Sequence, residues 1–198
     1  NEPGKGWHWN FKENVIRIDP KTLLEETMDE LRYLICHEGG HRRVTRLDFI
    51  PLEEWKQPGF AAMMNFIEDP RNDNFVADIY PLYRENIDVA WFNFFQKEQE
   101  KVEKMAMDRL GAKPRFVQAG YEYIRQWFDE IRGQKSEIKA DLSEEVKNVV
   151  RATLEQARDS WWRYPAREEA DKSEELIKKY AKVSYEINRD EIWPEFKK

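Results

Sequence analysis

The segment LICHEGGHRR, residues 34–43, constrains the fold more than any other part of this chain. Apolar residues at helical spacing lead into it: Leu24, Met28, Leu31, Leu34 and Ile35. Two adjacent glycines, Gly39 and Gly40, interrupt this pattern, although each glycine inside a helix costs about 1 kcal/mol relative to alanine. We therefore expect a helix from about 27 or 29 to about 46, in which the glycines leave space for a substrate or a neighbouring backbone.

The same segment contains an HExxH motif. His37 and His41 are four residues apart, so their imidazoles project from one face of the helix and can bind one metal ion. Glu38 is rotated away from that face, which lets its carboxylate reach a water on the metal instead of the metal. A catalytic zinc needs three protein ligands and one open position, so the motif predicts a Zn²⁺ site with a third ligand from another element.

The segment NFIEDPRND, residues 65–73, offers candidates for that ligand. Its oxygen-bearing side chains recur at spacings that share one helical face: Asn65, Glu68, Asp69, Asn72 and Asp73. The very apolar stretch FAAMM precedes them, so these carboxylates are expected to be buried. A buried carboxylate needs compensation, which a metal ion and Arg71, Arg42 or Arg43 can provide.

Composition limits the remaining classes of function. Charged residues make up 36% of the 198 residues, and glycine and proline are scarce, which is typical of helical proteins. The net charge of -6 argues against nucleic-acid binding, and no apolar run is long enough to span a membrane. The single cysteine, Cys36, excludes an intrachain disulfide, is expected to be a packed thiol, and favours a cytoplasmic location.

The rest of the chain is expected to form one hairpin and a series of helices. Alternating aromatic residues at 7–11, followed by apolar residues at 15–18, predict a β-hairpin or an edge strand. Pro70 is expected to kink or restart the helix that follows Gly59. Further helices are expected at roughly 83–110, 114–132, 141–163 and 165–190.

These elements suggest a catalytic region at residues 1–96 and a helical extension at 97–198 that packs on it as one structural unit. The fold class expected is mainly α, with the small hairpin or edge strand packed on the HExxH helix. Because the chain begins at Asn1 without methionine, we also expect it to be a piece of a longer protein.

The strand, the helix with HEGGH and the second helix with NFIEDPRND together resemble a gluzincin-type zincin metallopeptidase over roughly residues 7–80. More narrowly, HExxH paired with an N-x-x-E-D-x-R segment is similar to metallopeptidase-like domains found next to von Willebrand factor type A-like modules. This resemblance implies that His37, His41 and Glu68 are the metal ligands and that Glu38 is the general base. It also implies a further domain of the same chain as a partner.

The sequence departs from the usual gluzincin pattern at two positions. Asn72 stands four residues after Glu68, where an aspartate often supports a histidine, and Pro70 is expected to interrupt the helix directly after the ligand. If the pattern is aligned on Asp69 instead, Asp73 takes the place of that aspartate. Asp69 is therefore an alternative third ligand.

The expected reaction is hydrolysis of a peptide bond in a peptide or protein substrate. Zinc lowers the pKa of its water to about 7, and Glu38 moves the proton from this water to the leaving amine. Tyr80, Tyr83 or His8 is expected to stabilise the oxyanion. Two alternatives are a metal-binding zincin-like scaffold and a regulatory helical interaction module, neither of which cleaves peptides.

Overall fold

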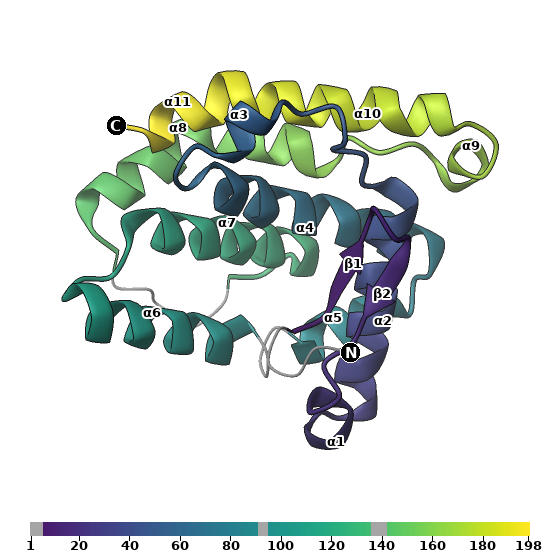
Figure 1. Cartoon of the computed structure of the whole chain (residues 1–198), viewed down its shortest axis with the longest axis horizontal. Coiled ribbons are helices and arrows are strands. Elements are labelled where there is room, and N and C mark those ends of the chain that lie inside the picture. Colours follow the sequence, from purple (N-terminus) through teal and green to yellow (C-terminus); the bar gives the residue numbers. More distant parts are fainter. Residues whose placement is uncertain (1–5, 91–94, 136–141) are drawn as a thin grey trace.

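The computed structural model describes residues 6–90, 95–135 and 142–198, and the protein is mainly helical with one small sheet (Figure 1). The N-terminal elements are β1 (His8–Asn10), β2 (Val15–Arg17), α1 (Thr22–Glu25), α2 (Met28–Val44), α3 (Leu52–Trp55), α4 (Phe60–Ile79) and α5 (Tyr83–Ala90). The C-terminal elements are α6 (Gln96–Leu110), α7 (Arg115–Arg132), α8 (Glu144–Trp161), α9 (Arg167–Ala170), α10 (Glu174–Ile187), the π-helix η2 (Asn188–Ile192) and α11 (Trp193–Phe196). The predicted mainly helical class is confirmed.

The aromatic N-terminal segment forms an antiparallel hairpin in which Trp9 lies opposite Ile16. At its turn the side chain of Asn10 accepts hydrogen bonds from two backbone amides, and Asn14 adopts a left-handed conformation with φ of 52°. Asparagine tolerates this conformation better than most residues. Arg42 Nε donates to Asn14 Oδ1 at 2.8 Å, which ties the hairpin to α2. The hairpin is thus packed on the HExxH helix, as expected.

Helix α2 begins with a reciprocal cap. Thr27 Oγ1 accepts from the Glu30 amide, and Glu30 Oε2 accepts from the Thr27 amide at 2.7 Å. Tyr33, Leu34 and Val44 lie in the core and hold one face of the helix against its neighbours. The predicted helix from 27 or 29 to about 46 therefore agrees with the structure to within two residues.

Helix α4 continues through Pro70, so the expectation that the helix restarts there is wrong. The expectation of a kink at Pro70 stays a prediction. Proline inside a helix removes one amide donor and costs about 3 kcal/mol. Helix α4 offsets this cost by burial, because every residue from Pro70 to Ala77 is buried.

Two other predicted helices are divided in the structure. The helix expected at 83–110 corresponds to α5 and α6, and residues 91–94 lie outside the described residues. The helix expected at 165–190 corresponds to the short α9 and to α10, because Ser173 caps a new helix by accepting from the Leu176 amide. The predictions at 114–132 and 141–163 correspond to α7 and α8, although residue 141 lies outside the described residues.

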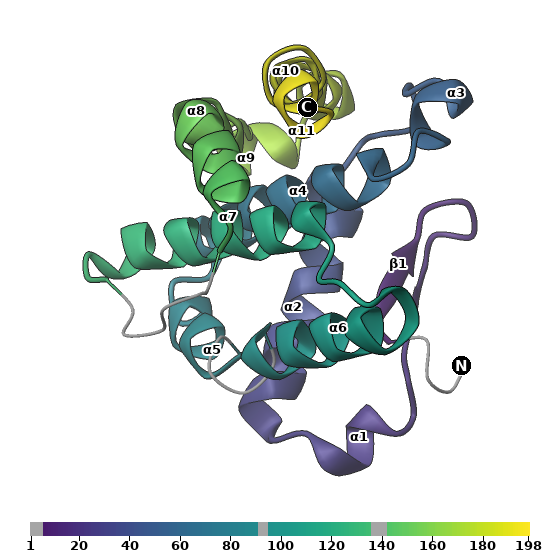
Figure 2. The same cartoon turned by 90° about the vertical axis from the view of Figure 1, so that its left-hand side faces the viewer.

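Helix α4 lies at the centre of the molecule and packs against α2, α7 and α8. Figure 1 shows α2 running across the direction of α4, with the hairpin beside α2. Figure 2 shows α8 and α10 on one side of the molecule and α5 and α6 on the opposite side. One apolar core contains Met63 and Ile67 of α4 together with Trp127 and Trp161 of the C-terminal helices. Within the described ranges, no helix is both long and apolar enough to cross a membrane.

Candidate metal centre

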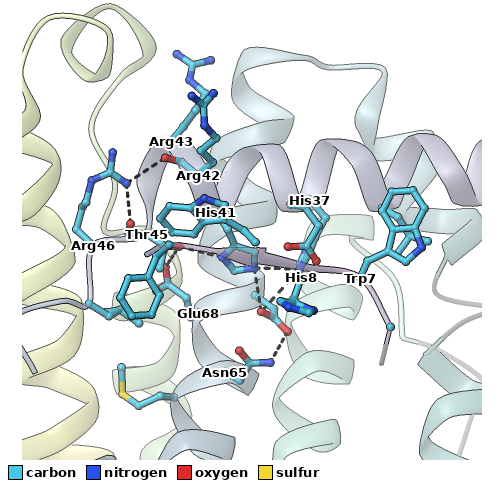
Figure 3. Close-up of a pocket in the computed structure, with 18 of the residues that line it drawn as sticks. Trp7, His8, His37, His41, Arg42, Arg43, Thr45, Arg46, Asn65 and Glu68 are labelled. Atoms are coloured by element: carbon cyan, nitrogen blue, oxygen red, sulfur yellow. Dashed lines mark hydrogen bonds and ion pairs between the residues drawn. The ribbon is translucent and has the colours of Figure 1, made fainter. Parts of the chain in front are cut away.

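Two histidines of α2 face each other as the HExxH motif predicts. His37 Nε2 and His41 Nε2 are 3.0 Å apart, and the two rings meet edge to face with centroids 4.6 Å apart. Both side chains are largely buried, with 11% and 13% of their surface exposed. Figure 3 shows them pointing into one pocket. The structure therefore brings together two nitrogen ligands of the kind that zinc prefers.

Asp69 of α4 supplies the nearest carboxylate. Its Oδ1 lies 3.3 Å from His41 Nε2 and 3.8 Å from His37 Nε2. Asn65, one turn earlier, donates to the other carboxylate oxygen at 3.4 Å. One possible ligand atom from each of His37, His41 and Asp69 lies within 4.8 Å of the other two. Among the predicted candidates, Asp69 is thus the carboxylate that shares a possible metal site with the histidines.

Glu68, the third ligand that the resemblance implies, is engaged elsewhere. Arg71 donates to both of its carboxylate oxygens, at 2.7 Å and 2.6 Å, and Thr45 Oγ1 donates to Oε1 at 2.5 Å. Burial by itself would raise the pKa of Glu68, but the charge of Arg71 and these hydrogen bonds lower it below its ordinary value of 4.5. Glu68 is therefore an ionised carboxylate in a buried ion pair.

Arg71, Arg42 and Arg43 were predicted to compensate the charge of the buried carboxylates. Of these three arginines, Arg71 is the one that pairs with a buried carboxylate. Arg71 is fully buried, and besides Glu68 it binds the carbonyl oxygens of Val44 and Arg163. Arg42 instead binds the hairpin, and Arg43 forms an ion pair with Asp171 before α10.

Asp73 supports His37 from the side opposite the pocket. Its Oδ1 lies 2.7 Å from His37 Nδ1 and accepts from Tyr83 at 2.8 Å, while Oδ2 accepts from Tyr33 at 3.1 Å. Burial would lower the pKa of His37, but the charge and hydrogen bond of Asp73 outweigh it and raise this pKa to about 10. A carboxylate behind a ligating histidine fixes its tautomer and ring orientation. Asp73 therefore has the geometry of a residue that supports a metal ligand.

Asn72 joins the two helices without facing the pocket. Its Nδ2 donates to the backbone carbonyl of His37 at 2.9 Å. Gly40 lies against the same side chain, since a Cβ added there would overlap Asn72 Oδ1 and Val76 Cγ2. This explains Gly40 as a point of close helix packing. A Cβ at Gly39 would meet nothing within 4 Å, so packing does not explain that glycine.

Glu38 lines the same cavity as the histidines. It is 6% exposed, and its carboxylate forms no hydrogen bond or ion pair with any residue that the structure describes. It is close enough to His37 that its charge contributes to the raised pKa of that histidine. This is an arrangement in which a carboxylate can act on a bound water or substrate.

The cavity has a volume of about 1610 Å³. Its wall includes the hairpin residues Trp7, His8 and Trp9 and the C-terminal residues Asp171 and Glu174. Pockets for small molecules typically measure about 300–1,000 Å³. This cavity is therefore large enough for a segment of polypeptide.

The three oxyanion candidates lie in different surroundings. His8 lines the cavity. Tyr83 is fully buried and donates to Asp73, and Tyr80 lies at the C-terminal end of α4 with 43% of its surface exposed. Of these three residues, His8 is the one that lines the cavity. Cys36 is partly buried and packed against the core, and burial raises the pKa of its thiol.

Two residues of the site were not predicted from the sequence. Thr45 Oγ1 lies 2.9 Å from His41 Nδ1, and Tyr33 contacts both His37 and Asp73. Helical spacing was the available signal, because residues four apart lie on one face of a helix. The residues with this spacing are Tyr33, His37 and His41 of α2 and Thr45, which follows the last residue of the helix.

Comparison with family models, curated proteins and solved structures finds no match to this chain. The arrangement of the residues themselves is therefore the basis for assigning a function.

Proposed function

We propose that this protein is a zinc-dependent metallopeptidase in which His37, His41 and Asp69 bind the metal and Glu38 is the general base. The observation that carries this proposal is the convergence of two imidazole nitrogens and one carboxylate oxygen beside a free glutamate in a large cavity. Two histidines and one carboxylate are a known ligand set for catalytic zinc.

The spacing of the donor atoms fits zinc. Two ligands each about 2.0–2.1 Å from a tetrahedral metal are about 3.3 Å apart. The three separations among the donor atoms of His37, His41 and Asp69 are 3.0, 3.3 and 3.8 Å. Both histidine Nδ1 atoms already have partners, so both Nε2 atoms are directed towards the common point.

Alignment of the gluzincin pattern on Asp69 supports the same assignment. Asp73 stands four residues after Asp69 and contacts His37, which is the relation expected between a third ligand and the aspartate that supports a histidine. We therefore propose Asp69 in place of Glu68 as the third ligand.

Zinc, when bound, would supply a Lewis acid and lower the pKa of a bound water to about 7. Glu38 would accept the proton of the attacking water and deliver it to the leaving amine. Asp73 and its two tyrosines hold His37 in position, and His8 is the candidate donor to the developing oxyanion. Within the described sheet, one edge of β1 has no strand partner, and an extended peptide would add there through main-chain hydrogen bonds.

Metal analysis and a cleavage assay test this proposal. We expect one zinc per chain in the purified protein and hydrolysis of denatured proteins or synthetic peptides. We expect Glu38→Gln to retain zinc and to lose hydrolysis, because an amide cannot accept a proton from water. Glu53→Gln, an exposed change on α3, is the control and should retain both properties.

The outcomes separate the alternatives. A chain without stoichiometric zinc would contradict the metal site and favour a helical interaction module. Zinc without cleavage by the wild-type protein would favour the metal-binding scaffold. Loss of zinc in Glu38→Gln would show that Glu38 is a ligand and that its assignment as a base is wrong.

A further inference from the structure

A chain of polar contacts leads from His41 at the cavity wall to the buried Arg71. It runs from His41 Nδ1 to Thr45 Oγ1, from Thr45 to Glu68, and from Glu68 to Arg71. Figure 3 shows the hydroxyl of Thr45 between His41 and Glu68. Glu68 is 3% exposed and Arg71 is not exposed at all, whereas His41 and Thr45 are partly buried and line the cavity.

The chemistry of Glu68 sets the direction of the hydrogen bonds. The bidentate contact with Arg71 keeps Glu68 ionised, and an ionised carboxylate only accepts hydrogen bonds. Thr45 must therefore donate its single hydroxyl proton to Glu68. Its oxygen then offers only lone pairs to His41.

His41 is the donor in the remaining contact. With Thr45 acting as an acceptor, the 2.9 Å contact requires a proton on His41 Nδ1. A neutral imidazole with a proton on Nδ1 has its lone pair on Nε2. That lone pair points towards Asp69 and His37, where the proposed metal would be bound.

We infer that Thr45 and Glu68 are positioning residues that hold His41 in its metal-binding tautomer. The inference rests on the proposed metal site and gives Glu68 a role other than that of a ligand. His37 receives the same support directly from Asp73, whereas His41 receives it through a hydroxyl. Arg71 also binds the carbonyl of Arg163, so residues after α8 help to hold this support in place.

Paired substitutions at Thr45 test the inference with the full chain. Thr45→Val keeps the β-branched shape and removes the hydroxyl, while Thr45→Ser keeps the hydroxyl and removes a methyl group. The measurement is the dissociation constant for Co²⁺, taken from its visible absorption, together with competition by Zn²⁺. We expect Thr45→Val to weaken binding about 10- to 100-fold, as is usual for loss of a group that supports a ligand, and Thr45→Ser to remain within about 3-fold of wild type.

A matched control removes a buried hydroxyl elsewhere. Thr153 of α8 is 1% exposed and bonds to Tyr123 and to the Val149 carbonyl. Thr153→Val should lower thermal stability without changing the Co²⁺ dissociation constant. In the zinc-loaded protein, the NMR signal of the His41 Nδ1 proton should be protected in wild type and should exchange rapidly in Thr45→Val.

The outcomes for this inference differ from those for the function. Failure of the wild-type protein to bind metal would overturn the proposed site itself. Wild-type metal binding that Thr45→Val leaves unchanged would overturn the positioning role and leave the site intact. Equal weakening by Thr45→Val and Thr45→Ser would also overturn it, because the hydroxyl would then not be the group that matters.

Discussion

Glu68 and Asp69 are neighbours in sequence, yet their side chains serve different partners. Successive residues of an α-helix are rotated by about 100°, so adjacent carboxylates cannot share one direction. Asp69 points to the two histidines, whereas Glu68 points to Thr45 and Arg71. For single residues, this rotation decides which carboxylate faces the two histidines.

We expect Asp69→Asn to weaken zinc binding by at least about 10-fold, because a neutral amide replaces the charged oxygen ligand. The change keeps the shape of the side chain, so the protein should remain folded by circular dichroism. Asp88→Asn, a change at a partly exposed ion pair with Arg132, is the control and should bind zinc as wild type does. Unchanged zinc binding by Asp69→Asn would favour Glu68 as the third ligand.

Asp73 has an unusual number of donors for one buried carboxylate. It is 1% exposed and accepts from Tyr33 and Tyr83, besides contacting His37. Burial is the main cause, and the charge of Asp73 the second, that raises the pKa of each tyrosine well above the ordinary value for tyrosine. Both tyrosines therefore remain neutral donors. The two rings also stack with centroids 5.6 Å apart, which fixes their hydroxyls relative to the carboxylate.

At the scale of elements, the packing of α2 on α4 places the two halves of the site. Gly40 permits this packing, because its missing side chain makes room for Asn72 and Val76. Asn72 then binds the backbone of α2 at His37. Gly40 of the HExxH motif thus has a structural role that is separate from metal chemistry.

The two glycines of the motif should respond in opposite ways to alanine. We expect Gly40→Ala to lower the free energy of unfolding by about 1–3 kcal/mol, because the helices must move apart. We expect Gly39→Ala to raise it by about 1 kcal/mol, because its Cβ meets open space and alanine favours the helix. Urea denaturation of both variants checks this, and equal effects at the two positions would contradict it.

At the scale of the whole molecule, the N-terminal and C-terminal regions share one core. Trp127 Nε1 donates to Asn74 Oδ1 at 2.9 Å, and Asn74 Nδ2 donates to the Trp161 carbonyl at 3.1 Å. These bonds join α4 to α7 and α8 in the middle of the molecule. Arg46 and Glu174 form a further ion pair between the end of α2 and the start of α10.

We therefore expect a fragment of residues 1–111 to lose cooperative folding. Without α7 and α8, the buried face of α4 would be exposed to water, including Met63 and Ile67. Thermal unfolding followed by circular dichroism should show no sigmoidal transition for the fragment and a clear one for the full chain. A fragment that unfolds cooperatively and binds zinc would instead show that residues 1–111 fold independently of the rest of the chain.

Local spacing in the sequence determined the hairpin, the limits of α2 and the pairing of His37 with His41, because such features depend on residues a few positions apart. The tertiary structure decided the rest of the site. How far α4 is rotated against α2 is set by packing at Gly40, and this rotation turns Asp69 towards the histidines and Glu68 away from them. The same burial keeps α4 helical through Pro70, where local propensity alone favoured a break. Packing between helices distant in sequence therefore decides which carboxylate faces the histidines.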